Sequence, residues 1–295
     1  MKTIYEDNEV KIISNKEPAP DKPLITFTDG SSVNLDTYEV INKGPGEIII
    51  RNKPMWPSMD TIIQKQERLF PIKHIHIEGG MNNVLIVPSD SNECFASIGG
   101  ADKFVQECDV SQCGDSLYIR TPKNKKRVYV NTKSVWVNGR RKPPKLDDDF
   151  GYVEIKCNYL NAITFDGWGV GNIICDVPVN ALRVENEGSS CFDIIRLKNA
   201  EITSSGSGNV FITELDGSLY GRISGSGDIH ILSGYISHAD VNIKGSGNLL
   251  VSAPIQTAEL SHSGSGSMIL TQILGEYTIK KTGSGIIRVL KSGTE

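Results

Sequence analysis

The chain has 295 residues, of which 38% are hydrophobic and 22% are charged, a balance typical of a folded protein rather than a disordered one. Its net charge of −4 at pH 7 gives no general attraction to nucleic acid or to an anionic membrane surface. No apolar run approaches the roughly 20 residues that a membrane-spanning helix needs, so no transmembrane segment is expected.

The start of the chain and its cysteines bear on location. Met1 to Asp7 contains no apolar stretch of the kind found in secretory signals, so the sequence as it stands predicts a cytoplasmic protein. The six cysteines form no C-x-x-C pair and no metal-finger spacing. In a chain of this length, so few cysteines favour free thiols over a disulfide framework.

The N-terminal segment, residues 1–70, is expected to form a small β-rich cap or a separate module. Leu24 to Phe27 and Val33 to Leu35 flank an Asp-Gly turn signal and predict a hairpin, and Glu47 to Arg51 predicts another strand. Apolar residues between Ser58 and Leu69 predict one short amphipathic helix.

From Ile72 the pattern changes to that of an irregular first rung of a repeat, which we assign to a second domain, residues 71–295. Hydrophobic Ile75 and Ile77 alternate with histidines, Gly79-Gly80 makes a corner, and a short apolar strand follows. The elements expected next are a short helix at Gly100 to Gln106, a hairpin turn at Gly114-Asp115 before the strand Leu117 to Arg120, strands at Val128 to Val130 and Val135 to Val137, and an exposed loop at 138–149.

The main signal is a repeat of about 19 residues in the C-terminal half. Glycine-rich corners, most of which read Gly-Ser-Gly, recur at spacings of 18 to 20 residues, which is the signature of stacked rungs. The corners begin at Gly169, Gly188, Gly206, Gly225, Gly245, Gly264 and Gly283.

Aligning the rungs on the first corner glycine turns the sequence into columns. The columns four and six residues after the corner are apolar in every rung, and the columns four and six residues before it are mostly apolar. Polar or mixed residues stand between them, and this period-two alternation is typical of strands with one buried face. Each rung is therefore predicted to be strand, tight corner, strand and return turn, and neighbouring rungs stack to share one core.

Two further columns are informative. The third residue after the corner glycine predicts a mostly polar stack that bridges corner amides; its members are Asn172, Cys191, Asn209, Asp228, Asn248, Ser267 and Ile286. Glycine at the corner itself is expected because it reaches backbone angles closed to other residues and lets rungs approach closely. A phosphate-binding loop would instead need a Lys-Ser/Thr and a helix after the glycines, so no nucleotide cofactor is expected.

The order of these segments resembles the auto-transporter adhesin head, or GIN, domain family. The resemblance rests on Ile75 to Gly80 with Val84 to Pro88, on Lys103 to Val105, on Gly114 to Ile119, and on the repeated corners such as Ser205 to Val210. It implies a right-handed, mostly parallel β-solenoid and a cell-envelope setting in bacteria. The family supplies no catalytic residues to carry over.

Candidate metal and nucleic-acid sites are weak. His74 and His76 lie two apart on one strand face, but no nearby ligand completes a set, so solvent-facing histidines are favoured. Asp147 to Asp149 lack the alternating oxygen spacing of a calcium loop. The basic runs Lys123 to Arg127 and Arg140 to Lys142 are short loops in an acidic chain, so neither a metal nor a nucleic-acid partner is expected.

A glycan-active lyase or hydrolase is the main alternative, because such enzymes also use parallel β-helices. It would need clustered carboxylates on one face, and the outward columns offer the adjacent Asp166 and Glu185 and, separately, Asp240 and Glu259. These charges are mixed with other polar residues, as on a solvated sheet face.

The most interesting outward column lies between the two inward columns after the corner. Its middle is partly apolar and forms the candidate contact surface: Phe211, His230, Leu250 and Ile269. The sequence thus predicts an all-β, parallel β-helix-like solenoid with a non-catalytic binding or scaffolding role toward a protein or carbohydrate. Homo-oligomer assembly through an unpaired solenoid end is a further alternative.

Overall fold

In a computed structural model, the chain divides into two compact units, Met1–Thr61 and Ile62–Glu295. The structure describes residues 63–81, 83–122 and 151–292, together with the backbone of short strands at residues 2–52, 136–137 and 140–141. The expected strand at Val128 to Val130 and the aspartates at Asp147 to Asp149 lie outside the described residues.

The first unit is built from antiparallel strands. An antiparallel sheet contains β1 to β4 in chain order, and β5 pairs with β6 as a separate hairpin. The predicted hairpin is confirmed, because β3 pairs antiparallel with β4, and the predicted strand at Glu47 is β6. The strands are β1 (Lys2–Glu6), β2 (Val10–Ser14), β3 (Leu24–Phe27), β4 (Ser32–Asn34), β5 (Tyr38–Gly44) and β6 (Glu47–Asn52).

The second unit begins with shorter elements that close one end of the repeat. The predicted helix is confirmed as α1, and the predicted hairpin joins β11 to β12 through Gly114, whose φ of 62° suits glycine. The elements are β7 (Ile63–Leu69), β8 (His74–Met81), β9 (Val84–Val87), β10 (Cys94–Gly100), α1 (Asp102–Glu107), β11 (Asp109–Cys113), β12 (Ser116–Thr121), β13 (Trp136–Val137), β14 (Arg140–Arg141) and β15 (Gly151–Lys156).

The helix predicted between Ser58 and Leu69 is wrong where the structure describes this segment, because Ile63–Leu69 forms strand β7. β7 pairs antiparallel with β10, so the open edge of β10 supplies backbone partners that outweigh a weak helical pattern. Residues 65–68 are exposed, as expected of an edge strand.

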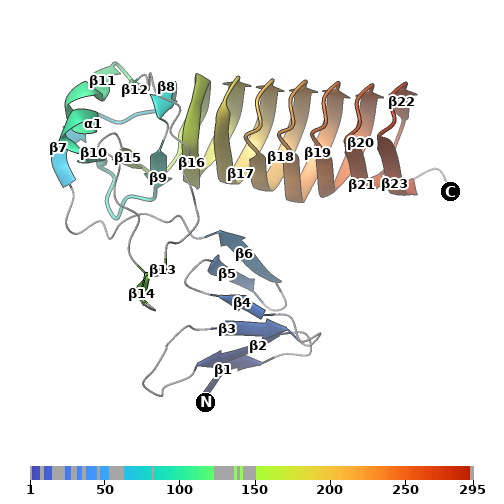
Figure 1. The fold of residues 1–295 in the computed structure, drawn as a ribbon, viewed down its shortest axis with the longest axis horizontal. Coiled ribbons are helices and arrows are strands. Elements are labelled where there is room, and N and C mark those ends of the chain that lie inside the picture. Colours follow the sequence, from blue (N-terminus) through green and yellow to red (C-terminus); the bar gives the residue numbers. More distant parts are fainter. Residues whose placement is uncertain are drawn as a thin grey trace. The chain divides into compact units, whose positions relative to one another are not determined.

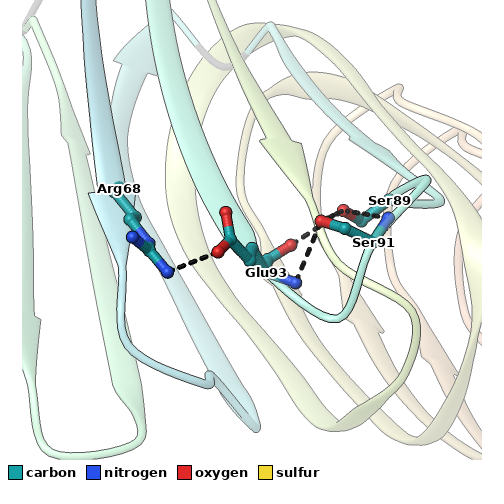
Figure 2. Close-up of polar contacts among 4 residues, drawn as sticks. All are labelled: Arg68, Ser89, Ser91 and Glu93. Carbon is teal, nitrogen blue, oxygen red and sulfur yellow. Dashed lines mark hydrogen bonds and ion pairs between the residues drawn. The ribbon is translucent and has the colours of Figure 1, made fainter.

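The connection from β9 to β10 is held by side chains rather than by regular structure (Figure 2). The Ser89 hydroxyl donates to the carbonyl of Glu93 at 2.8 Å, and the Glu93 amide donates to the Ser91 hydroxyl at 3.2 Å. An ion pair between Arg68 and Glu93 ties β7 to this connection. The loop therefore joins the edge strand to the body of the unit.

The solenoid consists of long strands that pair in parallel with their sequence neighbours, and Figure 1 shows them as successive rungs from β16 to β23. β8 and β9 pair in parallel with β16, which confirms the irregular first rung predicted from Ile72 onward. The strands are β16 (Leu160–Asn186), β17 (Ser189–Ser204), β18 (Val210–Ile223), β19 (Ile229–Ile243), β20 (Leu249–His262), β21 (Ser267–Ile273), β22 (Tyr277–Lys281) and β23 (Ile286–Ser292).

The predicted columns form the core. Val210 lies opposite Ile229, which lies opposite Leu249, and each of the three is at most 1% exposed. The columns before the corner stack in the same way; for example, Ile202 lies opposite Gly221, which lies opposite Val241. The fold class is confirmed as an all-β solenoid with rungs of about 19 residues.

The glycines that begin the regular corners are required by close approach rather than by unusual backbone angles. A Cβ atom built on Gly245 would overlap the carbonyl oxygen of Gly225 on the preceding rung, and Gly264 is placed in the same way over Gly245. None of the corner glycines that begin the described rungs has a positive φ in the left-handed region. For these glycines the close approach of rungs is the reason that applies, whereas Gly79 and Gly171, which stand second or in an irregular corner, have positive φ angles of 134° and 150°.

The predicted polar stack is confirmed as a ladder of side chains. The Oδ1 atom of Asn209 accepts the backbone N–H of Asp228 at 2.9 Å, and Asp228 Oδ1 accepts that of Asn248 at 2.7 Å. Asn248 Oδ1 in turn accepts the backbone N–H of Ser267 at 2.9 Å. Each side chain thus satisfies an amide on the next rung, where the corner interrupts the β ladder.

Candidate functional site

The predicted contact surface forms one continuous row, which we call the outer row: Phe211, His230, Leu250 and Ile269. Strand register places these residues opposite one another on four successive rungs. Phe211, His230 and Leu250 are partly buried by their neighbours, and Ile269 is 37% exposed. The ring centroids of Phe211 and His230 lie 6.4 Å apart, so the row begins with two adjacent rings.

The chemistry of the outer row changes along its length. Asp193 and Arg288 occupy the equivalent positions on the neighbouring rungs, so charged residues bound an apolar middle. His230 Nε2 lies 3.9 Å from Asp228 Oδ2, which places an acid beside the single titratable member of the row. An apolar strip with a polar boundary is the usual anatomy of a protein contact surface.

A second surface lies on the strands that precede the corners. It contains a shallow hollow of about 220 Å³ that crosses β16, β17 and β18. The hollow exists because the column seven residues before the corner holds small side chains, Ala162 and Ala181, at one end and larger ones such as His238 farther along. Its polar and aromatic lining includes Arg183, Asn199, Glu201, Ser218 and Tyr220.

Arg183, Glu201 and Tyr220 lie opposite one another on adjacent strands of the hollow. Arg183 donates to Glu185 at 2.7 Å, and this hydrogen bond, followed by the charge of Glu201, raises the pKa of the guanidinium. Tyr220 is 45% exposed, with its ring 6.1 Å from that of His238. The hollow therefore offers a cation, an anion and an aromatic ring to a ligand.

The two histidines singled out from the sequence lie on the same outward face, farther toward β12. His76 stacks on Tyr118 with ring centroids 4.8 Å apart and an interplanar angle of 11°. The guanidinium carbon of Arg120 lies over the Tyr118 ring, 5.7 Å from its centroid. Among the residues described, no group of three His, Cys, Asp or Glu side chains is placed to hold a metal ion.

Two of the four carboxylates considered for glycan chemistry, Glu185 and Asp240, are paired with arginines. Arg222 binds Asp240 through two hydrogen bonds of 3.0 and 2.5 Å, and Glu185 is bound by Arg183. The hydrogen bonds that Arg222 donates to Asp240 raise the pKa of its guanidinium. Asp240 and Glu185 are therefore each engaged by an arginine side chain.

One inward column was missed by the sequence analysis. Two residues before the corner glycine, Asn186 and His262 are buried and bind their own corner. Asn186 accepts from the Gly188 amide at 3.1 Å and donates to the Ser190 carbonyl at 2.8 Å. His262 makes the equivalent pair with Gly264 and Gly266. Because a carbonyl can only accept, His262 Nε2 donates to the Gly266 carbonyl, and Nδ1 accepts from the Gly264 amide.

The residues of the hollow were also missed, because the column five before the corner mixes charge with aromatic character. The sequence did contain one indication of the hollow, the small residues in the neighbouring column. They can be recognised as a depression only when side-chain sizes are compared between rungs.

In the part of the chain that the structure describes, no helix has the length and apolar character to cross a membrane.

Comparison with solved structures supports the fold. A "putative adhesin" from Bacteroides fragilis is 16% identical, and the likeness covers 79% of this chain and 97% of the other, with a TM-score of 0.54. A "putative adhesin" from Parabacteroides distasonis is 14% identical over 77% of this chain and 95% of its own, with a TM-score of 0.50. At these identities the likeness establishes a shared architecture.

Comparison of the sequence with families is more specific. No curated protein matches the chain significantly. Residues 73–293 match the family described as "Putative auto-transporter adhesin, head GIN domain", which spans the first rung, the corners and the last strand. The resemblance drawn from the corner glycines and the strands before them is therefore confirmed, and the chain belongs to this adhesin-head family.

Proposed function

We propose that this chain is a non-catalytic, adhesin-like binding protein that presents its outer row to the surface of another protein. The observation that carries the proposal is the register of Phe211, His230, Leu250 and Ile269 on four successive rungs. Outward positions of a solvated sheet are usually polar, and single apolar residues there need no explanation. Four consecutive rungs with a ring or aliphatic side chain at one outward position make a strip, and such strips mark contact surfaces.

Two further features support a binding role. The family is described as an adhesin head, and the described rungs make a stiff platform, because each is fixed by backbone ladders and by the Asn209–Asp228–Asn248 side-chain ladder. A platform of this kind loses little conformational entropy on binding, so its contact energy is available for affinity.

The test compares a double variant, Phe211→Ser with Leu250→Ser, with a control that removes exposed aromatics elsewhere, Tyr159→Ser with Tyr235→Ser. Both control tyrosines are 44–45% exposed and lie outside the outer row. Binding to arrays of immobilised bacterial and host surface proteins is measured after circular dichroism shows that each variant is folded. We expect the row variant to lose at least about tenfold in bound signal and the control to keep it. A folded row variant that binds as the parent does would remove the outer row from consideration.

A carbohydrate ligand is the second candidate, and the hollow favours it. A shallow depression with an exposed tyrosine ring beside Arg183 and Glu201 offers stacking and paired hydrogen bonds to a sugar. Here Tyr220→Ser should lower glycan-array signal, whereas the outer-row variant should not. A turnover screen on the same glycans with divalent metal present addresses the enzyme alternative: hydrolysis or elimination abolished by Asp166→Asn or Glu185→Gln would overturn the non-catalytic proposal.

A further inference from the structure

The last rung of the solenoid leaves core positions exposed. Tyr277 and Ile279 continue two inward columns, yet they are 38% and 42% exposed. In the same columns one rung earlier, Ala258 and Leu260 are each 2% exposed. The inward face of β22 is therefore covered on one side by β20 and is left open on the other by the residues that the structure describes.

The backbone of this rung is also open. β22 pairs only with β20, and β23 pairs only with β21, as far as the described strands go. The outer edges of both strands thus present a row of N–H and C=O groups in register for another parallel strand. Edges of this kind bind extended segments by strand addition, in which backbone hydrogen bonds supply affinity and side-chain contacts supply specificity.

The opposite end of the repeat is closed. The outer edge of β8 is paired with β12, and that of β9 is paired with β15. Antiparallel pairing of β11 with β12 and of β10 with β15 then ends the parallel stacking. A second copy of the solenoid therefore finds no regular parallel rung there on which its own last rung could continue.

The open rung is basic, although the chain is acidic. Lys280, Lys281, Arg288 and Lys291 are exposed on it, with Glu276 as the one carboxylate in residues 276–292, which gives a charge of +3 (four cations less one anion). With −4 for the whole chain, the remainder carries −7. Two open ends facing each other would bring like charges together, so pairing of two copies through this end is disfavoured.

We propose that the edge of β22 and β23 binds an extended acidic segment of a partner protein as an added parallel strand. In that register, alternate apolar side chains of the segment cover Tyr277 and Ile279, and the acidic side chains between them lie beside Thr278 and Lys280. Lys281 stands in the inward column of His262 and adds positive charge to the same strand. The occupant is thus a strand-forming peptide in which apolar and acidic residues alternate. This interaction goes beyond the lateral contact proposed above and uses none of the outer row.

The test uses the full chain and a fluorescent peptide that alternates valine and glutamate, with a valine–lysine peptide of equal length as the charge-reversed probe. Fluorescence anisotropy should show saturable binding of the acidic peptide that weakens as salt is raised. The double variant Lys280→Glu with Lys281→Glu should bind the acidic peptide at least about tenfold more weakly and gain affinity for the basic one. Lys244→Glu, an exposed cation on a covered rung, is the matched control and should change neither affinity.

Three outcomes would overturn the proposal: no binding of the acidic peptide, an unchanged peptide preference in the folded charge-reversed variant, or a dimer in light scattering that Ile279→Ser converts to a monomer. The last result would assign the end to a second copy. Phe211→Ser with Leu250→Ser should bind the acidic peptide normally, so failure of the lateral contact and failure of this one are separable.

Discussion

Gly245→Ala should destabilise the solenoid although alanine is compatible with the backbone conformation at this corner. The added Cβ would overlap the carbonyl oxygen of Gly225 on the preceding rung, which is backbone and cannot rotate away. That carbonyl accepts the amides of Ser246 at 2.9 Å and of Gly247 at 3.3 Å. Moving it to relieve the overlap therefore weakens both hydrogen bonds.

The expected cost follows from these contacts. Two backbone hydrogen bonds contribute about 1 kcal/mol each, and forcing an extra carbon into a packed site costs about 1–3 kcal/mol. Restricting the unfolded chain by replacing glycine offsets about 0.4–1 kcal/mol of this loss. The free energy of unfolding should therefore fall by about 2–4 kcal/mol.

The neighbouring Ser246→Ala is the matched control, because it removes an exposed hydroxyl contact with Ser265 and adds nothing to the corner. It should change the free energy of unfolding by less than about 0.5 kcal/mol. Urea unfolding followed by far-ultraviolet circular dichroism compares the midpoints of the parent and the two variants. Equal midpoints for Gly245→Ala and Ser246→Ala would refute the view that corner glycines serve close approach between rungs.

Three other perturbations test the interior. Asn248→Leu removes the acceptor of the Ser267 amide and should cost about 1–3 kcal/mol, with faster hydrogen exchange at Ser267; unchanged exchange would count against the ladder. His262→Asn should change the free energy of unfolding by no more than about 1 kcal/mol, because Asn186 makes the same two hydrogen bonds at its own corner. His262→Ala should lower the free energy of unfolding by about 3 kcal/mol in the same urea assay. Equal losses for the two variants would contradict the equivalence of Asn186 and His262. Burial raises the pKa of the Cys108 and Cys157 thiols from 9.0 to about 12. Below pH 9 both thiols are protonated in the folded and the unfolded chain, so the free energy of unfolding does not depend on them there. Between pH 9 and 12 only the unfolded chain loses these protons, and the free energy of unfolding falls by up to about 1.4 kcal/mol per pH unit for each thiol. Replacing both with alanine should flatten the alkaline fall in urea midpoint, and an unchanged slope would argue that these thiols titrate normally.

Much of the solenoid could be predicted because each rung repeats the previous one along the solenoid axis, so the same packing constraint acts on equivalent residues of every rung. Val210, Ile229 and Leu249 fall in one column, and parallel stacking makes such a column a line of contacts, so alternation in the sequence maps directly onto the core. The polar ladder followed from the same alignment, including its end at Ile286, which is 58% exposed.

The features that escaped prediction depend on comparisons between rungs or on tertiary partners. Glycine at a corner is explained equally well by backbone angle and by close approach until the carbonyl of the preceding rung is located. The strand at Ile63–Leu69 exists because β10 offers it an edge, and its own sequence does not reveal that partner. The hollow beside Tyr220 arises from the difference in size between Ala181 and His238, which a binary apolar–polar pattern does not record.

Because the corners stack directly on one another, one whole rung can be removed from the solenoid without disturbing the alignment of the others. Removing residues 225–244 would join Ser224 directly to Gly245, and every column would stay in phase because the next corner takes the place of the lost one. Such a deletion shortens the stack by one strand spacing, about 4.8 Å, and brings Phe211 beside Leu250 without altering either end. Length can therefore change in whole-rung steps by duplication or loss of a short stretch of coding sequence, while the capping strands and the open terminal rung are inherited unchanged.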